Sequence, residues 1–202
     1  MTWVDDDYRR GSMSFPGADG SEGYICVPMD IPADSEFTIS MWAKQEDPSA
    51  LKGLFVMARE GGADGTGPVC QMEGSNDFRS WLGASTLWGR FATGEGFTQA
   101  RGDDPSLVAD EWTHIACRMT DTHIENLVNG QVVARYDHET RRQEKGWTHG
   151  FAGAERILLG NAHVGPWPGL LDDIRIYKVA LTDAQIGYLL LPSPPQAALH
   201  LK

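Results

Sequence analysis

Two adjacent aspartates, Asp172 and Asp173, stand in an otherwise apolar stretch near the end of the chain. Residues 171–177 have the composition of a β-strand, in which successive side chains alternate between two faces. Asp172 is therefore expected on the same face as Ile174 and Ile176, where burial is expected. A carboxylate there needs a cation or a set of backbone N–H donors, because an uncompensated buried charge costs several kcal/mol or takes up a proton. The sequence leaves these two alternatives open.

Two loop regions carry aromatic residues beside polar ones. One covers residues 161–168 and leads into the aspartate strand. The other lies within residues 53–102, where short apolar runs alternate with long glycine-rich segments that include Trp88. Loops on a rigid scaffold carry binding residues more often than the scaffold itself. Both regions are therefore candidates for a binding surface, although the aromatic rings could instead fill a core.

The familiar catalytic motifs are absent from the sequence. It contains no G-x-S-x-G, H-E-x-x-H, phosphate-binding loop or dinucleotide fingerprint, and its six histidines lack metal-ligand spacing. Glycoside hydrolysis needs two carboxyl groups about 5 to 10 Å apart across the scissile bond. Adjacent strand residues such as Asp172 and Asp173 point to opposite faces, which is a poor geometry for that reaction. We predict a protein that is not an enzyme, with a glycoside hydrolase or lyase as the less favoured reading.

The charge of the chain limits its partners. Its 202 residues carry a net charge of −11. Proteins that bind nucleic acids need clustered Lys and Arg to replace counterions, so a nucleic-acid partner is not expected. The basic cluster of Arg141, Arg142 and Lys145 also contains Glu139 and Glu144, and is expected in a solvated loop.

The sequence also bears on where the protein is made. The N-terminus, MTWVDDDYRR, has three consecutive acids where a signal peptide would be basic and then apolar. Apolar runs such as residues 54–58 and 188–191 are far short of the roughly 20 residues that span a bilayer. The three cysteines fit neither a disulfide framework nor a zinc site. We expect cytosolic synthesis without membrane insertion, and leave open display on a virion or an extracellular surface.

The elements that position these residues are predicted to be strands joined by turns. Residues 37–44 and 112–119 alternate between apolar and polar side chains. Asn129-Gly130 lies between two apolar runs and predicts a type I′ hairpin, because both residues tolerate positive φ. Further strands are predicted at residues 53–59, 78–82, 156–160 and 170–177.

A short helix is predicted near the C-terminus. Thr182 and Gln185 have the spacing of a capping box and begin a helix through about Leu190. Prolines at 192, 194 and 195 then end it. We therefore predict one domain over residues 1–191 and a proline-containing tail over residues 192–202, because a chain of this length is ordinary for a single large sandwich.

Three stretches occur in a recognisable order: FTISMWAK (37–44), EWTHIACRMTDTHIENLVNGQVVARYD (111–137) and ILLGNAHVGPWPGLLDDIRIYKVALTDAQI (157–186). In order and spacing they resemble the laminin G-like, concanavalin A-type superfamily, which also contains pentraxins and many lectin-like modules. The family pattern is an early strand with a central Trp, W-x-H-x-A, an N-G or D-G turn, G-x-[IL]-D-D-[IV]-R-[IV]-Y and a short helix. The resemblance implies an all-β fold, an antiparallel two-sheet jelly-roll β-sandwich with a short C-terminal helix. It is specific to the fold and not to an activity.

The resemblance also implies a calcium site. In related modules a calcium ion often lies between the opening loop and the late aspartate pair. Here the stretch MSFPGADGSEGYICVP (13–28) resembles the opening strand, although Pro16 stands where an acid is common. The implied ligands are Asp19, Asp172 and Asp173, and calcium requires 6 to 8 oxygens. Alternatively, Asp172 accepts N–H groups of the opening loop and fastens that loop to the sheet.

The function implied is recognition or adhesion without catalysis, through edge loops that bind a glycan or glycoconjugate. An indole stacks on the apolar face of a sugar, while Arg, His and Asn bind its hydroxyls. The alternative is a structural component of a virus or phage particle, such as a capsid decoration or fibre protein, whose partners are the other proteins of that assembly. The candidate ligand-binding residues are Trp167, His163, Asn161, Trp88 and Arg90.

Overall fold

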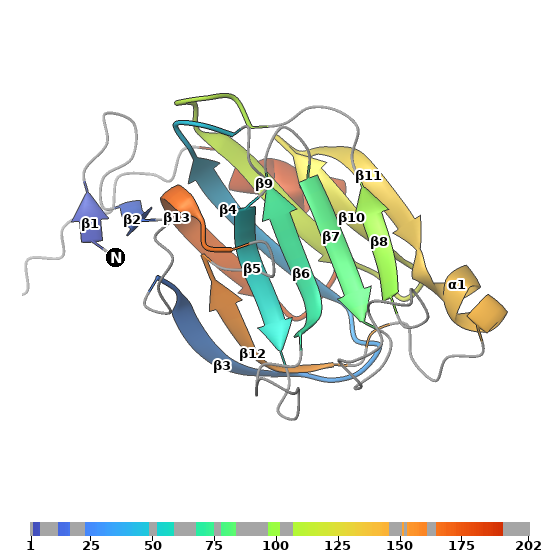
Figure 1. Cartoon of the computed structure of the whole chain (residues 1–202). Helices are drawn as coiled ribbons and strands as arrows, with labels where there is room; N and C mark the ends of the chain where they lie inside the picture. Colours follow the sequence, from blue (N-terminus) through green and yellow to red (C-terminus); the bar gives the residue numbers. More distant parts are fainter. Residues whose placement is uncertain are drawn as a thin grey trace, which may run out of the picture.

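The computed structural model arranges the chain in two antiparallel β-sheets that pack face to face (Figure 1). The strand order is β1-β2-β13-β4-β9-β10-β11 in sheet A and β3-β12-β5-β6-β7-β8 in sheet B. Together with a short C-terminal helix, these sheets confirm the predicted all-β jelly-roll sandwich. The structure describes residues 2–4, 12–16, 23–48, 52–58, 68–74, 78–83, 97–101, 107–145, 151, 153–160 and 165–191.

The strands predicted from the sequence, at residues 37–44, 112–119, 53–59, 78–82, 156–160 and 170–177, agree with the observed bounds to within about two residues, whereas β1, β6 and β8 were not predicted. The strands of sheet A are β1 (Thr2–Val4), β2 (Ser12–Pro16), β13 (Pro168–Tyr177), β4 (Phe37–Lys44), β9 (Thr113–Met119), β10 (His123–Val128) and β11 (Gln131–Asp137). The strands of sheet B are β3 (Ile25–Ile31), β12 (Ala154–Leu159), β5 (Lys52–Ala58), β6 (Pro68–Gly74), β7 (Phe78–Gly83) and β8 (Phe97–Arg101).

The core lies between the two sheets and follows from the alternation of strand side chains. In β4, Phe37, Ile39 and Met41 all belong to the core and are at most 1% exposed. Sheet B contributes Phe55 and Met57 of β5 to the same cluster. Burial of such side chains stabilises the fold by about 1.5–3 kcal/mol for each large apolar residue. Residues between them in the sequence therefore lie on the outer faces of the sheets.

The Asn129-Gly130 turn connects β10 and β11 as predicted. Asn129 has φ 48° and Gly130 has φ 78°, the positive values that a type I′ turn requires. Asn129 also binds β9, because its Oδ1 accepts the His114 N–H at 3.1 Å and its own N–H donates to the His114 carbonyl at 2.8 Å. The turn is thus fastened to the neighbouring strand.

Helix α2 (Asp183–Leu189) lies on the outer face of sheet A, behind the sandwich in Figure 1. The predicted capping box is present: Thr182 Oγ1 accepts the Gln185 N–H, and Gln185 Oε1 accepts the Thr182 N–H. The helix packs Ile186 and Leu189 onto a small apolar cluster that includes Leu127 of β10. This face of the sandwich is therefore covered.

A second helix, α1 (His138–Lys145), replaces the solvated loop predicted for the basic cluster. The loop prediction was wrong because local pairing favours a helix here. Asp137 Oδ1 accepts the Thr140 N–H at 2.8 Å in the manner of an N-cap. Glu139 binds Arg142 one turn later at 2.7 and 2.6 Å, and this guanidinium, together with Gln143, lowers the pKa of Glu139 to about 2.

The directions of the strands place each connection at one of the two ends of the sandwich. One end, here called the loop end, is where β12 ends and β13 begins. β2, β4 and β8 also end there, and the Asn129-Gly130 turn lies there. At the opposite end β7 ends and β8 begins.

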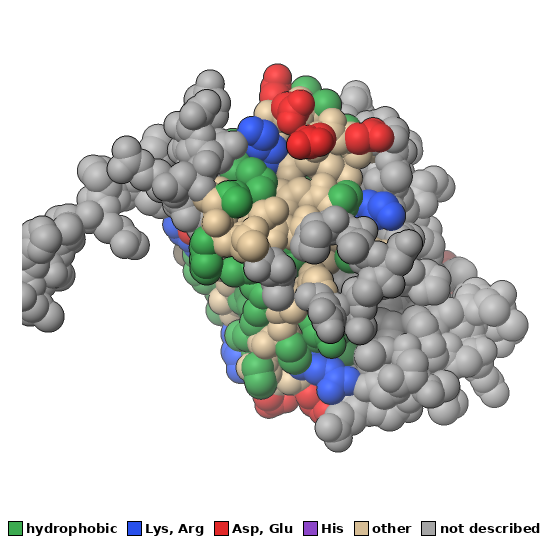
Figure 2. All heavy atoms as spheres, turned by 60° about the vertical axis from the view of Figure 1, so that its left-hand side comes forward, with side chains coloured by type: hydrophobic (Ala, Val, Ile, Leu, Met, Phe, Trp, Pro, Cys, Tyr) green, Lys and Arg blue, Asp and Glu red, His purple; other side chains and the backbone are tan. Residues whose placement is uncertain are grey.

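The edge of sheet B at β3 is poorly suited to pairing with another strand. Pro28 offers no N–H, and Lys178 Nζ donates to the Asp30 carbonyl. Figure 2 brings this side of the molecule forward and shows hydrophobic side chains over much of its described part, with Lys and Arg side chains around them and acidic side chains at the upper and lower margins. Exposed Cys26 lies on this strand, whereas Cys117 is buried.

Two further predictions concern membrane insertion and the C-terminal tail. Within the described ranges, no helix is both long and apolar enough to cross a membrane. The predicted tail at residues 192–202 lies outside the described residues, so the division at residue 191 stays a prediction.

Candidate functional site

The aspartate strand contains a β-bulge that changes which way Asp172 faces. Asp172 pairs with Trp42 and Arg175 with Ser40, so β13 has one residue more than β4 between these pairs. Asp173 is the extra residue and has φ 48°. An extra residue reverses the alternation of all side chains beyond it.

The prediction that Asp172 shares a face with Ile174 and Ile176 is therefore wrong. Leu171 is in the core, and Ile174 and Ile176 pack against it. Asp172 lies between Leu171 and the bulge, on the outer face of sheet A. No pattern of residue types in this stretch marks the bulge, because the aspartate at positive φ looks like any other polar strand residue.

Each aspartate is compensated locally. The Arg175 guanidinium holds both carboxylate oxygens of Asp173, with Nε 2.7 Å from Oδ1 and Nη2 2.8 Å from Oδ2. This bidentate pair raises the pKa of Arg175. Asp172 Oδ1 accepts the N–H of Asp173 at 2.7 Å. A backbone donor therefore compensates Asp172, and Arg175 compensates Asp173; whether Asp172 also accepts N–H groups of the opening loop stays a prediction, because residues 17–22 lie outside the described residues.

The described residues fit a calcium ion poorly. Asp19 lies outside them, and Arg175 places a positive charge on both oxygens of Asp173. β2 ends at Pro16 opposite Pro168, four residues along β13 from Asp172, which is about 13 Å in a strand. Within the described ranges, no group of three His, Cys, Asp or Glu side chains could hold a metal. Calcium binding stays a prediction of the family resemblance.

Trp167 is buried and does not offer its ring to solvent. It is 0% exposed and belongs to the core. This placement corrects its assignment as a stacking platform, because a sugar needs an accessible indole face. An aromatic residue before a strand is compatible with either position, so the sequence could not distinguish them.

The loop that contains Asn161 and His163 is held at both ends. Gly160 donates its N–H to the Leu54 carbonyl at 2.7 Å, and Trp167 donates its N–H to the Gly160 carbonyl at 2.9 Å. Gly53 donates to the Gly165 carbonyl at 3.0 Å. Buried Trp167 thus anchors one flank of residues 161–164. Asn161 and His163 themselves lie outside the described residues.

Trp88 and Arg90 also lie outside the described residues. They belong to the segment between β7 and β8, whose flanking strand ends lie at the end of the sandwich opposite the loop end. The strand ends that flank Trp88 and Arg90 therefore lie at the opposite end of the sandwich from those that flank Asn161 and His163.

Sequence reasoning did not identify Gln45 and did not predict the burial of Trp167. Gln45 is 2% exposed, and neither polar atom of its side chain has a hydrogen-bond partner among the described residues; the same holds for Trp167 Nε1. They are neighbours across Gly169: a Cβ added there would lie 3.0 Å from Trp167 Nε1 and 3.3 Å from the Gln45 Cα. A buried unpaired polar group costs about 1–3 kcal/mol. The loop end therefore contains buried polar atoms, the Gln45 amide and the Trp167 indole N–H, close beneath its surface.

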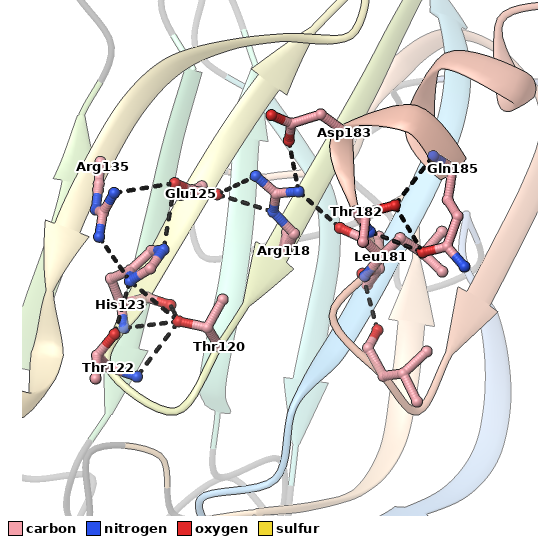
Figure 3. Close-up of polar contacts among 12 residues, drawn as sticks. Arg118, Thr120, Thr122, His123, Glu125, Arg135, Leu181, Thr182, Asp183 and Gln185 are labelled. Carbon is pink, nitrogen blue, oxygen red and sulfur yellow. Dashed lines mark hydrogen bonds and ion pairs between the residues drawn. The ribbon is translucent and has the colours of Figure 1, made fainter.

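A charge network covers the other part of the outer face of sheet A (Figure 3). Arg118 is its centre. It donates to Glu125 Oε2 from Nε at 2.8 Å and Nη2 at 2.5 Å, and from Nη1 to the Leu181 carbonyl at 2.6 Å and Asp183 at 2.8 Å. Burial acts to lower the pKa of Arg118, but these acceptors outweigh it and raise the pKa.

The network continues onto β10 and β11 of the same sheet. His123 Nε2 lies 3.3 Å from Glu125 Oε1, and Arg135 Nη1 lies 3.7 Å from the same atom. Burial lowers the pKa of His123, against the opposing effect of Glu125. The carboxylate of Glu125 is thus neutralised by cations, which suits fastening α2 to the sheet and does not suit proton transfer.

Comparison with known proteins identifies the family. Residues 19–187 match the family described as the concanavalin A-like lectin/glucanases superfamily. No curated protein matches the chain.

Similar solved structures share the fold at low sequence identity. One is domain 4 of AbnA, a GH43 extracellular arabinanase from Geobacillus stearothermophilus, in complex with arabinotriose, with TM-score 0.65, 20% identity, and 94% of this chain and 80% of that chain covered. A heptameric SAP-like pentraxin from Limulus polyphemus has TM-score 0.61, 14% identity, and 88% and 80% coverage. The binding domain of botulinum neurotoxin DC in complex with SialylT has TM-score 0.64, 10% identity, and 94% and 44% coverage.

These likenesses show the fold alone, whereas the sequence match covers most of the chain and agrees with the two-sheet architecture. The protein belongs to the concanavalin A-like lectin/glucanases superfamily.

Proposed function

We propose that this protein is a non-catalytic module that binds a glycan or glycoconjugate through its loop end. The observation that carries the proposal is the anchoring of the 160–167 loop, whose flanks are fixed by hydrogen bonds to Leu54, Gly160 and Gly53. A loop that is held in advance loses less conformational entropy on binding. Asn161 and His163 are the proposed ligand contacts, with Trp167 as the residue that positions their loop.

The comparisons support the class of ligand. The arabinanase domain was solved with arabinotriose, and cell entry of botulinum neurotoxin type C depends on interaction with two ganglioside molecules. The family description also includes lectins. Asn and His side chains supply the donors and acceptors that sugar hydroxyls need. We therefore favour a carbohydrate over a protein as the first ligand to test.

The described carboxylates support a module without turnover. Glycosidases need one carboxyl group free to give a proton and a second one to act as base or nucleophile. Here Glu125 is bound by Arg118, and Asp173 by Arg175. Both guanidinium groups thus occupy carboxylate oxygens that a glycosidase would need free. Assembly into a virus particle, the alternative function, has no described contact in its favour and stays a prediction.

Glycan-array screening of the full chain, followed by titration calorimetry on the best ligand, tests the proposal. Asn161→Ala and His163→Ala should each weaken binding by about tenfold, because each removes hydrogen bonds to sugar hydroxyls. Asp121→Ala is the control, since Asp121 is exposed in the turn between β9 and β10 at the opposite end. Binding to no glycan, or equal affinity in both loop variants and the control, would overturn the proposal.

A further inference from the structure

The ammonium group of Lys52 lies beside the loop that carries the proposed ligand contacts. Lys52 is the first residue of β5, and the next residue, Gly53, donates its N–H to the Gly165 carbonyl at 3.0 Å. A Cβ added at Gly165 would lie 3.8 Å from Lys52 Nζ. We propose that Lys52 binds a carboxylate of the ligand, so that the loop end takes an acidic glycan whose charged sugar is a sialic acid or a uronic acid.

The Lys52 ammonium lacks an anionic partner within the described part of the chain. Its side chain is half-buried, and no hydrogen bond or ion pair from a described residue reaches Nζ. A partly desolvated ammonium without an anion is unfavourable. A ligand carboxylate would replace the lost hydration with a charge-assisted hydrogen bond. Four other described cations already have such acceptors within the chain: Arg118, Arg142, Arg175 and Lys178.

Gly165 leaves the ammonium accessible from the loop. Its φ is 102°, a backbone conformation that residues with a side chain rarely adopt. Apart from the glycine and its chain neighbours, Lys52 Nζ is the only described atom within 4 Å of the position that a Cβ would take. A side chain at residue 165 would lie against the ammonium, whereas the glycine leaves this approach free for a ligand.

The carboxylates of the loop end limit the charge of the ligand. Glu46 and Asp47 follow β4, Asp110 and Glu111 precede β9, and all four side chains are exposed. The Asp110 N–H donates to the Gln45 carbonyl at 2.9 Å, so the two segments lie side by side. These charges and the net charge of −11 repel a polyanion. One ammonium in this setting suits a single carboxylate better than a sulfated or polyuronic chain.

This inference rests on the proposed glycan-binding function and adds a charge preference to the same site. Titration calorimetry tests it with two matched pairs: sialyllactose with lactose, and a disaccharide that ends in glucuronic acid with its glucose counterpart. At least one acidic member should bind about tenfold more tightly than its neutral counterpart, because hydrogen bonds to ionised acceptors are stronger than neutral ones. The pair that shows this preference identifies the charged sugar. A heparin oligosaccharide should bind more weakly than that acidic member.

Variants of Lys52 show whether its charge causes the preference. Lys52→Gln should lower the affinity for the acidic member to that for the neutral one, and Lys52→Arg should retain the preference. Lys178→Gln is the matched control, since it removes the same charge where β13 ends, opposite the loop end, and should leave the preference unchanged. Circular dichroism checks the fold of each variant. If Lys52→Gln does not fold, raising NaCl from about 50 to about 500 mM should weaken wild-type binding of the acidic member alone.

The results that would overturn this inference differ from those that would overturn the proposed function. Equal affinity for the acidic and neutral members, a preference that survives in Lys52→Gln, or tighter binding of heparin would each overturn the role of Lys52. So would binding of neither pair when the array yields a neutral ligand. Loss of binding in Asn161→Ala would then leave the proposed function standing. A chain that binds no glycan of either charge would overturn the proposed function itself.

Discussion

The side-chain amide of Gln45 and the indole N–H of Trp167 are unusual, because buried polar atoms normally have hydrogen-bond partners. Among the described residues these atoms have none. Both lie where β4 ends and β13 begins, and Gly169 allows the close approach of the two strands there. A Cβ at position 169 would lie 2.3 Å from the Lys44 carbonyl oxygen, so larger residues would separate the strands. The unpaired amide of Gln45 is therefore a cost of the geometry at this end of the sandwich.

Replacing Gln45 with methionine should stabilise the protein. Met has nearly the same shape and removes a buried amide without hydrogen bonds, so the free energy of unfolding should rise by about 1 kcal/mol. Urea denaturation measures it. Thr38→Val is the control and should lower stability, because Thr38 Oγ1 donates to the Val179 carbonyl and accepts the Leu181 N–H, both at 2.9 Å. A loss of stability in Gln45→Met would show that the amide has a partner, such as bound water.

The bidentate Asp173–Arg175 pair leads to a prediction about calcium. Because the guanidinium occupies both oxygens of Asp173, millimolar calcium should shift the melting temperature by less than about 1 °C relative to EDTA. Thermal melting in the two buffers measures it. A larger stabilisation by calcium that disappears in Asp172→Asn would contradict this expectation and support the site implied by the family resemblance.

At the scale of elements, Arg118 joins three parts of the chain. It lies on β9, binds Glu125 on β10, and reaches the Leu181 carbonyl and Asp183 where α2 begins. The apolar contacts of α2 with Leu127 then add hydrophobic burial to this polar connection. The covering of sheet A thus depends on one buried guanidinium.

Arg118→Met should destabilise the fold by about 3 kcal/mol, because it leaves the Glu125 carboxylate buried without its main cation. The double variant Arg118→Met/Glu125→Leu should recover most of this loss, since an apolar pair has no charge to compensate. Chemical denaturation of both variants measures the difference. Equal destabilisation in the single and double variants would mean that packing of the arginine, and not its charge, holds α2.

Which elements the sequence predicted depends on how local their causes are. The Asn129-Gly130 turn and the Thr182 capping box are correct because each is determined by the residues within it. The bulge at Asp173 and helix α1 were missed. The bulge depends on the register between β13 and β4, which is not local. Helix α1 does have local causes, the Asp137 cap and the pair of Glu139 with Arg142, and was missed because the prediction considered the composition of the basic cluster and not this spacing.

The candidate site was predicted less completely than the fold. Burial of Trp167 and the unpaired Gln45 depend on how β4, β13 and the loop pack together, and no sequence spacing encodes that contact.

At the scale of the whole molecule, the charge network makes stability depend on pH. Burial lowers the pKa of His123 below its ordinary 6.5, so the unfolded chain takes up a proton before the folded one as the pH falls. The stability from neutral His123 is complete above pH 6.5 and is lost as the pH falls through the lower folded pKa. The ionised Glu139 carboxylate contributes stability in a separate pH range, because its effect is lost between pH 4.5 and about 2.

Denaturation at a series of pH values checks this dependence. The free energy of unfolding should fall as the pH drops below 6.5, and His123→Gln should flatten the curve in that range. The variant should keep the separate decline below pH 4.5 that Glu139 contributes. An identical slope around pH 6 in both proteins would show that His123 does not control this transition.

The outer face of sheet A and the loop end have different proposed roles. Sheet A carries α2 and the charge network on its outer face, while the loop end is the proposed surface for contact with a ligand. The most direct test is a titration of the full chain with the best ligand from the glycan array, in which bound ligand and newly formed reducing ends are both measured. The account predicts saturable binding with the glycan recovered intact. Cleavage of the glycan, or no saturable binding to any carbohydrate, would contradict it.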